Sequence, residues 1–135
     1  KNNNILYLTE PISELAKSMY GSKKYFNYDE VKALDLFLGK INFLFKNISL
    51  ITIRVHPNEK LKKYKRILKK YKNLPLKVSE NSLQSDLRQN HNIIGTVSSV
   101  LFIALQKNKK VFTILGKNNS FFKIPFKKLR YLGIA

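Results

Sequence analysis

Short apolar runs of the strand type alternate along the chain with helical segments, and this alternation limits the fold more than any other feature. Each run is bounded by polar or turn-forming residues, and the runs cover residues 5–8, 50–55, 76–78, 92–95 and 110–114. The helices predicted between them cover residues 28–47, 59–72, 82–89 and 100–105. Strands that are apolar almost throughout are typical of a parallel sheet buried on both faces. The sequence therefore predicts an α/β fold, a Rossmann-like parallel sheet of about five strands with helices on both faces.

Two segments carry more specific expectations. The helix over residues 59–72 is predicted to be amphipathic, with basic residues around an apolar stripe made of Leu61, Tyr64, Leu68 and Tyr71. After Gly116 the pattern fades. The stretch that ends at Leu129–Leu132 is interpreted as a loop followed by a last helix packed on the sheet.

Length and composition limit the class of protein. The chain has 135 residues, of which 44% are hydrophobic and 12% aromatic, so it can bury one core and is too apolar for a disordered basic tail. No apolar run approaches the about 20 residues that span a bilayer. The absence of cysteine excludes disulfides, thiolate nucleophiles and zinc-thiolate sites, and it fits a reducing cytoplasm. We therefore expect one domain over residues 1–135 and a cytoplasmic location.

The charge is strongly positive, with 26 Lys and Arg against 8 Asp and Glu and a formal net charge of +18. Only four of the basic residues are arginine, whereas proteins that read bases and phosphates favour arginine. A lysine-rich solvated surface therefore explains most of the charge, and nucleic acid is the less favoured partner. Binding of a polyanion, or peripheral contact with the anionic inner face of the cell membrane, stays open as an alternative.

Polar residues follow four of the predicted strands at the point where each strand ends. They are Thr9–Glu10–Pro11, His56–Pro57, Ser79–Glu80 and Thr96–Val97–Ser98–Ser99. The carboxyl ends of parallel strands meet at one edge of the sheet, and ligands of open α/β sheets bind in the crevice outside that edge. We therefore predict the functional site there.

Three features of this edge suit a phosphate. A helix that begins at Ser98 and Ser99 presents free N–H groups, the positive end of its dipole and hydroxyl donors, although serine is also an ordinary helix cap. His56 can donate from its imidazole to an anionic oxygen, although a histidine followed by proline is also an ordinary loop residue. Arg54 lies two residues earlier on the same side of the strand and can neutralise a phosphate.

Acidic side chains supply the remaining candidates. Glu80 directly follows a strand, where a carboxylate can accept hydrogen bonds from a ribose diol, and it can equally cap the helix that begins at Ser82. Thr9 and Glu10 belong to a loop at the same edge. His91, between two asparagines, receives no role.

Several motifs are missing from the sequence. It contains no glycine-rich phosphate loop, no His, Asp and Glu cluster with metal-ligand spacing, and no Ser-His-acid trio of the elbow type. Their absence argues against dinucleotide-dependent hydride transfer, ATP hydrolysis and zinc chemistry. We expect neither a metal nor a cofactor.

The order of the motifs resembles the C-terminal nucleotide-binding half of GT-B-type glycosyltransferases over about residues 5–115. A His-Pro after a central strand, an acid after the next strand and a Ser-Ser pair before an apolar helix are most similar to bacterial sialyltransferases with HP and SS/ST motifs. The resemblance implies a donor such as CMP-sialic acid, used for surface glycans such as lipopolysaccharide or capsule. It also implies a role for each matching residue: phosphate contacts for His56, Ser98 and Ser99, with His56 stabilising the leaving group and Pro57 completing the donor-binding His-Pro motif, a ribose contact for Glu80, and a place beside the donor for Thr9–Glu10.

The same resemblance implies an N-terminal domain that binds the glycan acceptor and carries the general base. A chain of 135 residues has room for only one such domain, so we expect the acceptor domain to lie outside it and the chain alone to be inactive. The motifs are also similar to those of CDP-glycerol-dependent polymerases of teichoic acid synthesis, in which an Asp-Tyr stands where this chain has Thr96–Val97, and of UDP-sugar 2-epimerases.

Overall fold

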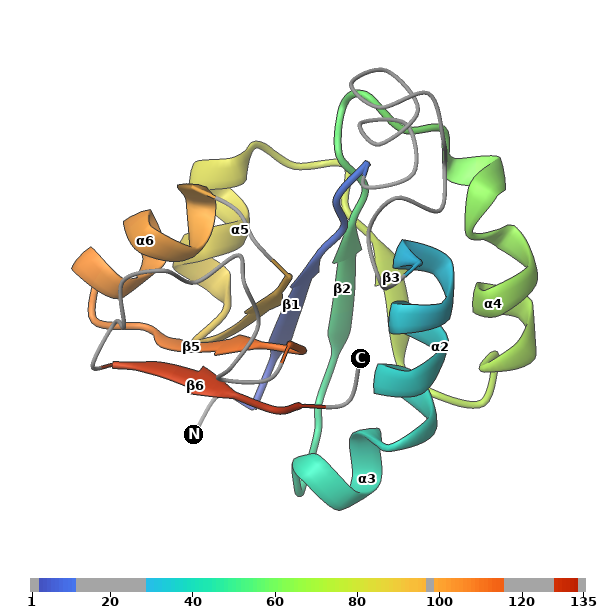
Figure 1. Cartoon of the computed structure of the whole chain (residues 1–135), viewed down its shortest axis with the longest axis horizontal. Helices are drawn as coiled ribbons and strands as arrows, with labels where there is room; N and C mark the ends of the chain where they lie inside the picture. The colour runs from blue at the N-terminus through green and yellow to red at the C-terminus, as the bar shows by residue number, and fades with distance from the viewer. Residues whose placement is uncertain (1–2, 12–28, 97–98, 116–127, 134–135) are drawn as a thin grey trace.

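Six parallel strands form one sheet in the part of the chain that the computed structural model describes, which is residues 3–11, 29–96, 99–115 and 128–133 (Figure 1). The strand order is β3-β2-β1-β4-β5-β6, and each neighbouring pair is parallel. The strands are β1 (Ile5–Leu8), β2 (Ile51–Arg54), β3 (Leu76–Val78), β4 (Asn92–Gly95), β5 (Lys110–Thr113) and β6 (Leu129–Tyr131). The predicted α/β Rossmann-like sheet is therefore confirmed, with one strand more than expected.

The sixth strand corrects the prediction of a final helix. Leu129 pairs in register with Val111, and its side chain is buried. Arg130 points to the other face, where its guanidinium lies over the Phe112 ring at 5.5 Å from the centroid. Three residues are too few for a periodicity signal, because a strand this short shows only one alternation. Residues 116–127, which the same interpretation covered, lie outside the described part of the chain.

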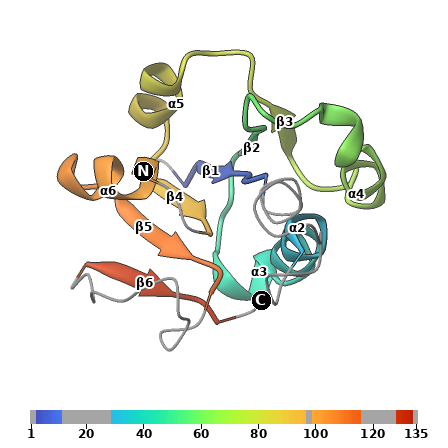
Figure 2. The same cartoon turned by 45° about the horizontal axis from the view of Figure 1, so that its top comes forward.

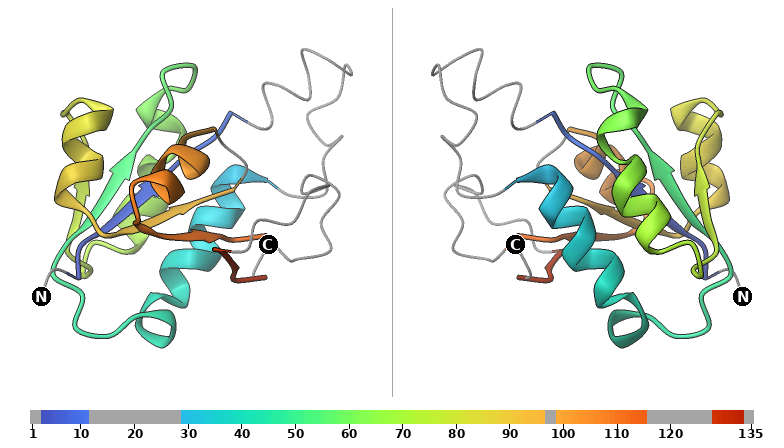
Figure 3. Two further views of the ribbon diagram at one scale, coloured as in Figure 1. Left: turned by 90° about the vertical axis from the view of Figure 1, so that its left-hand side faces the viewer. Right: turned by 90° about the vertical axis from the view of Figure 1, so that its right-hand side faces the viewer.

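Helices cover both faces of the sheet (Figures 2 and 3). One face carries α2 (Glu30–Gly39), α3 (Ile41–Leu44), the 3-10 turn η1 (Leu61–Lys63) and α4 (Lys65–Lys70), and the other carries α5 (Leu83–Gln89) and α6 (Ser99–Gln106). Side chains of β1 alternate between the two cores: Ile5 and Tyr7 join the α2 side, while Leu6 and Leu8 join the α5 and α6 side. This alternation explains why the run is apolar throughout, since both faces are covered.

The helix predicted over residues 28–47 is interrupted. Asp29 caps α2 by accepting hydrogen bonds from the backbone N–H groups of Val31 and Lys32, and α2 ends at Gly39. There the Tyr71 hydroxyl approaches so closely that an added β-carbon would lie 3.0 Å from it. The turn at Lys40 then leads into the separate helix α3.

The stripe predicted for residues 59–72 is partly wrong. Tyr64 is fully buried, and Leu68 and Tyr71 pack against the core, but Leu61 is 39% exposed. Ile67 is buried in its place. The reason is that the segment begins as the 3-10 turn η1, which has three residues per turn and rotates the first residues away from the face that an α-helix would present.

The strand order places a topological switch point beside β1. The chain runs from β1 outward through β2 to β3, and then returns to the other side of β1 as β4. Ligands of such sheets bind in the crevice at the carboxyl ends of the two strands where the order reverses. Among the described residues, no helix has the length and apolar character needed to cross a membrane.

Candidate functional site

A cavity of about 170 Å³ opens at the carboxyl ends of β1 and β2, on the face covered by α5 and α6. It is lined by Leu8, Thr9, Glu10, Arg54, His56, Pro57, Leu83 and Val100. Val100 belongs to the first turn of α6, which follows β4, so the cavity reaches from the ends of β1 and β2 to the side of the switch point between β1 and β4. Five residues predicted for the site from the sequence, Thr9, Glu10, Arg54, His56 and Pro57, thus line one cavity.

His56 is held in one orientation by its neighbours. The backbone N–H of Asn58 donates to the imidazole Nδ1 at 3.0 Å. Because a backbone N–H can only donate, Nδ1 must accept, and the proton of the neutral ring is on Nε2. The backbone carbonyl of His56 accepts from the N–H of Glu59 at 2.9 Å, which closes the turn around Pro57. The site histidine is therefore set to donate from Nε2.

Thr9 joins the ends of the two strands. Its backbone N–H donates to the Arg54 carbonyl at 3.1 Å, and its hydroxyl oxygen accepts from the backbone N–H of His56 at 2.9 Å. The same hydroxyl donates to Oε1 of Glu59 at 2.6 Å. Thr9 is 5% exposed, so its contacts are shielded from water and fix the position of the His56 backbone relative to β1.

Glu59 is the buried acid of the site, and the sequence analysis missed it. Its carboxylate has no exposed surface, and it accepts hydrogen bonds from Thr9, from the Tyr64 hydroxyl and from Lys63 Nζ, the last at 2.8 Å. Lys63 also pairs with Oε1 of Glu30 at 2.8 Å. A signal was present, since Glu59 is the one acid in a lysine-rich segment, three residues after His56 and four before Lys63.

Burial and the hydrogen bond to Glu59 raise the pKa of the Tyr64 hydroxyl well above its ordinary value. Tyr64 therefore keeps its proton and acts only as a donor to the carboxylate. Among the described residues, two carboxylates and one ammonium group meet in this cluster, and the donors from Thr9 and Tyr64 stabilise the negative charge of Glu59. The cluster anchors the turn that carries His56.

Arg54 is paired within the protein. Its Nη1 donates to the Asn81 carbonyl at 2.7 Å and to Oδ2 of Asp86 at 3.0 Å. Asp86 is 1% exposed and also accepts from the Ser79 hydroxyl. Asp86 therefore compensates the charge of Arg54 and holds the guanidinium at the wall of the cavity. A guanidinium has five N–H donors, so Arg54 can also donate to a ligand.

The lining of this cavity does not include the other predicted residues that the structure describes. Glu80 is exposed and is not among the lining residues of this cavity, and the cap of α5 is Ser82, whose hydroxyl accepts from the N–H of Ser85. Ser98 lies outside the described residues, and Ser99 is the first residue of α6. His91 is exposed.

The start of α6 packs close to the sheet at Gly95, the last residue of β4. A β-carbon at Gly95 would lie 3.0 Å from Cδ2 of Leu101, so glycine permits this approach. Thr96 follows, 2% exposed, and its hydroxyl has no hydrogen-bond partner among the residues that the structure describes. Its carbonyl accepts from the Thr113 hydroxyl at 2.7 Å. A buried hydroxyl thus stands immediately before the segment that leads to the helix start.

Within the described ranges, no three His, Asp or Glu side chains gather as a metal site would require. Comparison with protein-family models, with curated proteins and with solved structures finds no match to this chain. The geometry of the cavity is therefore the basis for any assignment.

Proposed function

We propose that this chain is the donor-nucleotide-binding domain of a GT-B-type glycosyltransferase that transfers a sugar of the sialic acid kind from its CMP derivative to a bacterial surface glycan. The observation that carries the proposal is the cavity at the carboxyl ends of β1 and β2, beside the switch point, which gathers Thr9, Glu10, Arg54, His56 and Pro57. This is the edge at which open α/β sheets bind nucleotides.

The phosphate of the donor would be held by donors that already face the cavity. His56 offers Nε2–H, because Asn58 occupies Nδ1. Arg54 contributes a guanidinium fixed by Asp86, and the eight-residue helix α6 directs the positive end of its dipole from the adjacent wall. These groups are fixed before the ligand arrives, so they need little reorganisation when charge develops.

In the reaction, an acceptor hydroxyl oxygen forms a bond to the anomeric carbon while the bond from that carbon to the CMP phosphate oxygen breaks. The electron pair of the broken bond stays on the phosphate, where His56 and Arg54 stabilise it. The acceptor proton passes to a general base on the second domain. The cavity of about 170 Å³ is smaller than the about 300 Å³ at which ligand sites begin, which fits a site completed by another domain.

Nucleotide titration tests the proposal directly. Calorimetry of the purified chain with CMP, CDP and UDP should show saturable binding, with CMP bound most tightly. His56→Ala should weaken CMP binding about tenfold, the loss expected for one charge-assisted hydrogen bond, while His91→Ala, which changes the exposed second histidine, should not. Tighter binding of CDP or UDP would point to the polymerase or epimerase type of site. Absence of binding by all three nucleotides would overturn the proposal.

A second candidate function is the binding of a polyanion, and one surface favours it. The segment that contains η1 and α4 carries exposed basic residues with no acidic partner among the described residues, and these are Lys60, Lys62, Lys65, Arg66, Lys69 and Lys72. Salt distinguishes the two functions. Affinity for a polyanion falls steeply as salt rises because counterions are released, whereas CMP held by a few fixed donors should respond much less.

A further inference from the structure

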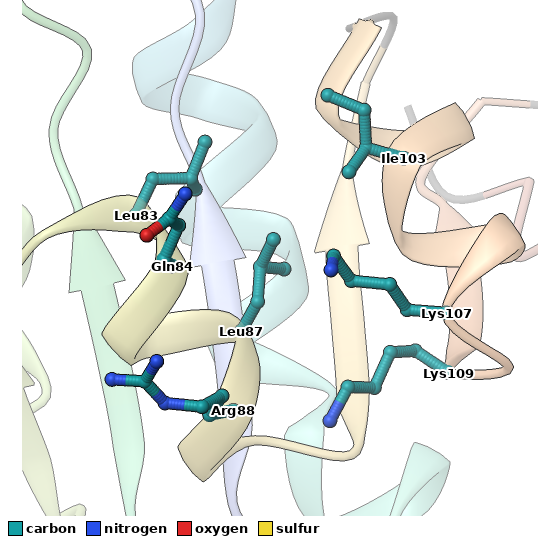
Figure 4. A pocket seen from close by; sticks show the side chains of 7 residues that line it. All are labelled: Leu83, Gln84, Leu87, Arg88, Ile103, Lys107 and Lys109. Carbon is teal, nitrogen blue, oxygen red and sulfur yellow. The ribbon is translucent and has the colours of Figure 1, made fainter.

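A groove of about 520 Å³ lies between α5 and α6, roughly three times the volume of the candidate nucleotide cavity. Figure 4 shows the side chains that line it, which are Leu83, Gln84, Leu87, Arg88, Ile103, Lys107 and Lys109. Leu83 lines both this groove and the nucleotide cavity. The groove has a chemistry of its own, because apolar and cationic side chains are separated along its length.

The apolar part lies toward the carboxyl ends of the strands (Figure 4). Leu87 is buried at its base and Leu83 is half-buried. Ile103, on the facing wall, is 41% exposed and is one of three large apolar side chains that the described residues leave open to solvent. Contact with an apolar partner would remove these side chains from water, which is favourable for association.

The cationic part lies at the other end, where Lys109 extends toward α5, with Lys107 midway, and the Arg88 guanidinium on α5 points away from Lys109 (Figure 4). None of the three has an acidic partner among the described residues. Residues 87–135 contain no Asp or Glu, and Asp86, the acid of α5, is buried against Arg54. These three cations are therefore left for water or an acidic partner, as far as the described residues show.

This cationic end is separate from the proposed nucleotide site. Arg88 stands in the last turn of α5, and Lys109 precedes β5, so both lie toward the amino edge of the parallel sheet. The nucleotide cavity is at the carboxyl edge. The proposed contact with the donor phosphate therefore does not explain why these cations line the groove.

We propose that the groove docks an acidic amphipathic helix of a partner protein. The two walls are helices of seven and eight residues, about 10 to 12 Å long, so they flank about two turns of a third helix packed between them. Apolar residues of the partner, spaced three or four apart, contact Leu83, Leu87 and Ile103. Acidic residues one turn further along the same face reach Arg88, Lys107 and Lys109.

The helix is favoured over a lipid by the openness of the walls. Gln84 and Arg88 on α5, and Ile103 and Lys107 on α6, are all exposed. A small amphiphile is usually buried over most of its surface in its site, whereas a docked helix leaves its outer face in water. A helix also matches the observed separation of apolar and charged contacts along one axis.

The test uses synthetic helical peptides of about four turns and the full 135-residue chain. One peptide carries leucines at positions i, i+3, i+4 and i+7 with glutamates on the flanking positions, and a matched peptide carries lysines in place of the glutamates. Chemical-shift mapping should show that the acidic peptide binds and the lysine peptide does not, with shift changes at Leu83, Leu87 and Ile103. The double variant Arg88→Glu, Lys107→Glu should weaken binding at least tenfold, and Ile103→Ser several-fold.

Matched controls lie on other elements. Lys69→Glu changes an exposed, unpaired lysine of α4, and Phe43→Ser removes an apolar side chain that is 88% exposed on α3. Both should leave peptide affinity unchanged. The proposal is overturned if the acidic peptide causes no chemical-shift changes in the groove. It is also overturned if the control variants weaken peptide binding as much as the groove variants do. It is also overturned if vesicles containing phosphatidylglycerol shift the groove residues while the peptide does not. None of these outcomes depends on nucleotide binding.

Discussion

Removing the buried carboxylate of Glu59 should strongly destabilise the chain. The side chain is fully buried and accepts hydrogen bonds from Thr9, Lys63 and Tyr64. Glu59→Ala leaves these donors without their acceptor and opens a small cavity. Breaking one partner of a buried ionic network costs about 3 to 5 kcal/mol. That is a large part of the about 5 to 15 kcal/mol that stabilises a domain of this size.

The isosteric variant Glu59→Gln should cost less, about 1 to 2 kcal/mol. The amide oxygen can still accept from Tyr64 and Lys63, and the amide nitrogen can donate to the Thr9 hydroxyl, so the main loss is the charge opposite Lys63. Lys63 retains its second partner, Glu30. The ordering of the two variants follows from the number of donors that each leaves unpaired.

Urea denaturation followed by circular dichroism measures both variants against the parent chain. Glu80→Ala is the matched control, because it removes an exposed glutamate outside this cluster, and its effect should stay within about 0.5 kcal/mol. A loss of less than about 1 kcal/mol in Glu59→Ala, or an equal loss in Glu80→Ala, refutes the view that Glu59 anchors the His56 turn.

Other contacts give further tests. Because the pKa of Tyr64 is raised in the folded state, its stabilising contribution is fully present below the ordinary tyrosine value of about 10 and is lost above it. The stability advantage of the parent over Tyr64→Phe should therefore shrink by about 1.4 kcal/mol per pH unit in urea titrations above pH about 10, and an unchanged advantage contradicts this. Arg54→Met should cost about 3 to 5 kcal/mol by leaving Asp86 buried and unpaired, and Arg54→Met with Asp86→Leu should recover most of it in the same assay. Gly95→Ala should cost about 1 to 3 kcal/mol in thermal unfolding, because the new methyl group crowds Leu101.

The local features of the fold were readable from the sequence. Five strands and the main helices follow from runs and spacings of apolar residues, and these patterns arise within a few positions of the chain. Caps are local in the same way: the hydroxyl of Ser82 and the carboxylate of Asp29 accept from N–H groups two or three residues onward. The location of His56–Pro57 at the end of a strand could likewise be predicted from the neighbouring residues alone.

The pairings within the site were decided only in three dimensions. Thr9 meets Glu59 across 50 positions, and Arg54 meets Asp86 across 32. A single sequence carries no signal for such pairs, since many acids and donors could satisfy one another equally well. The prediction named Glu80 and Glu10 as acids of the site; the structure places Glu10 in the cavity lining, leaves Glu80 exposed, and buries Glu59, which was not predicted, beside His56.

By itself, then, the sequence determined the strands, the helices and the edge of the sheet where polar side chains collect, because backbone geometry and the alternation of apolar residues are properties of neighbouring positions. Tertiary structure decided the strand order, the sixth strand, the partner of Arg54 and the burial of Glu59. The reason is that pairing and desolvation depend on which distant segments pack together. The same packing formed the basic groove between α5 and α6, which no local pattern predicted.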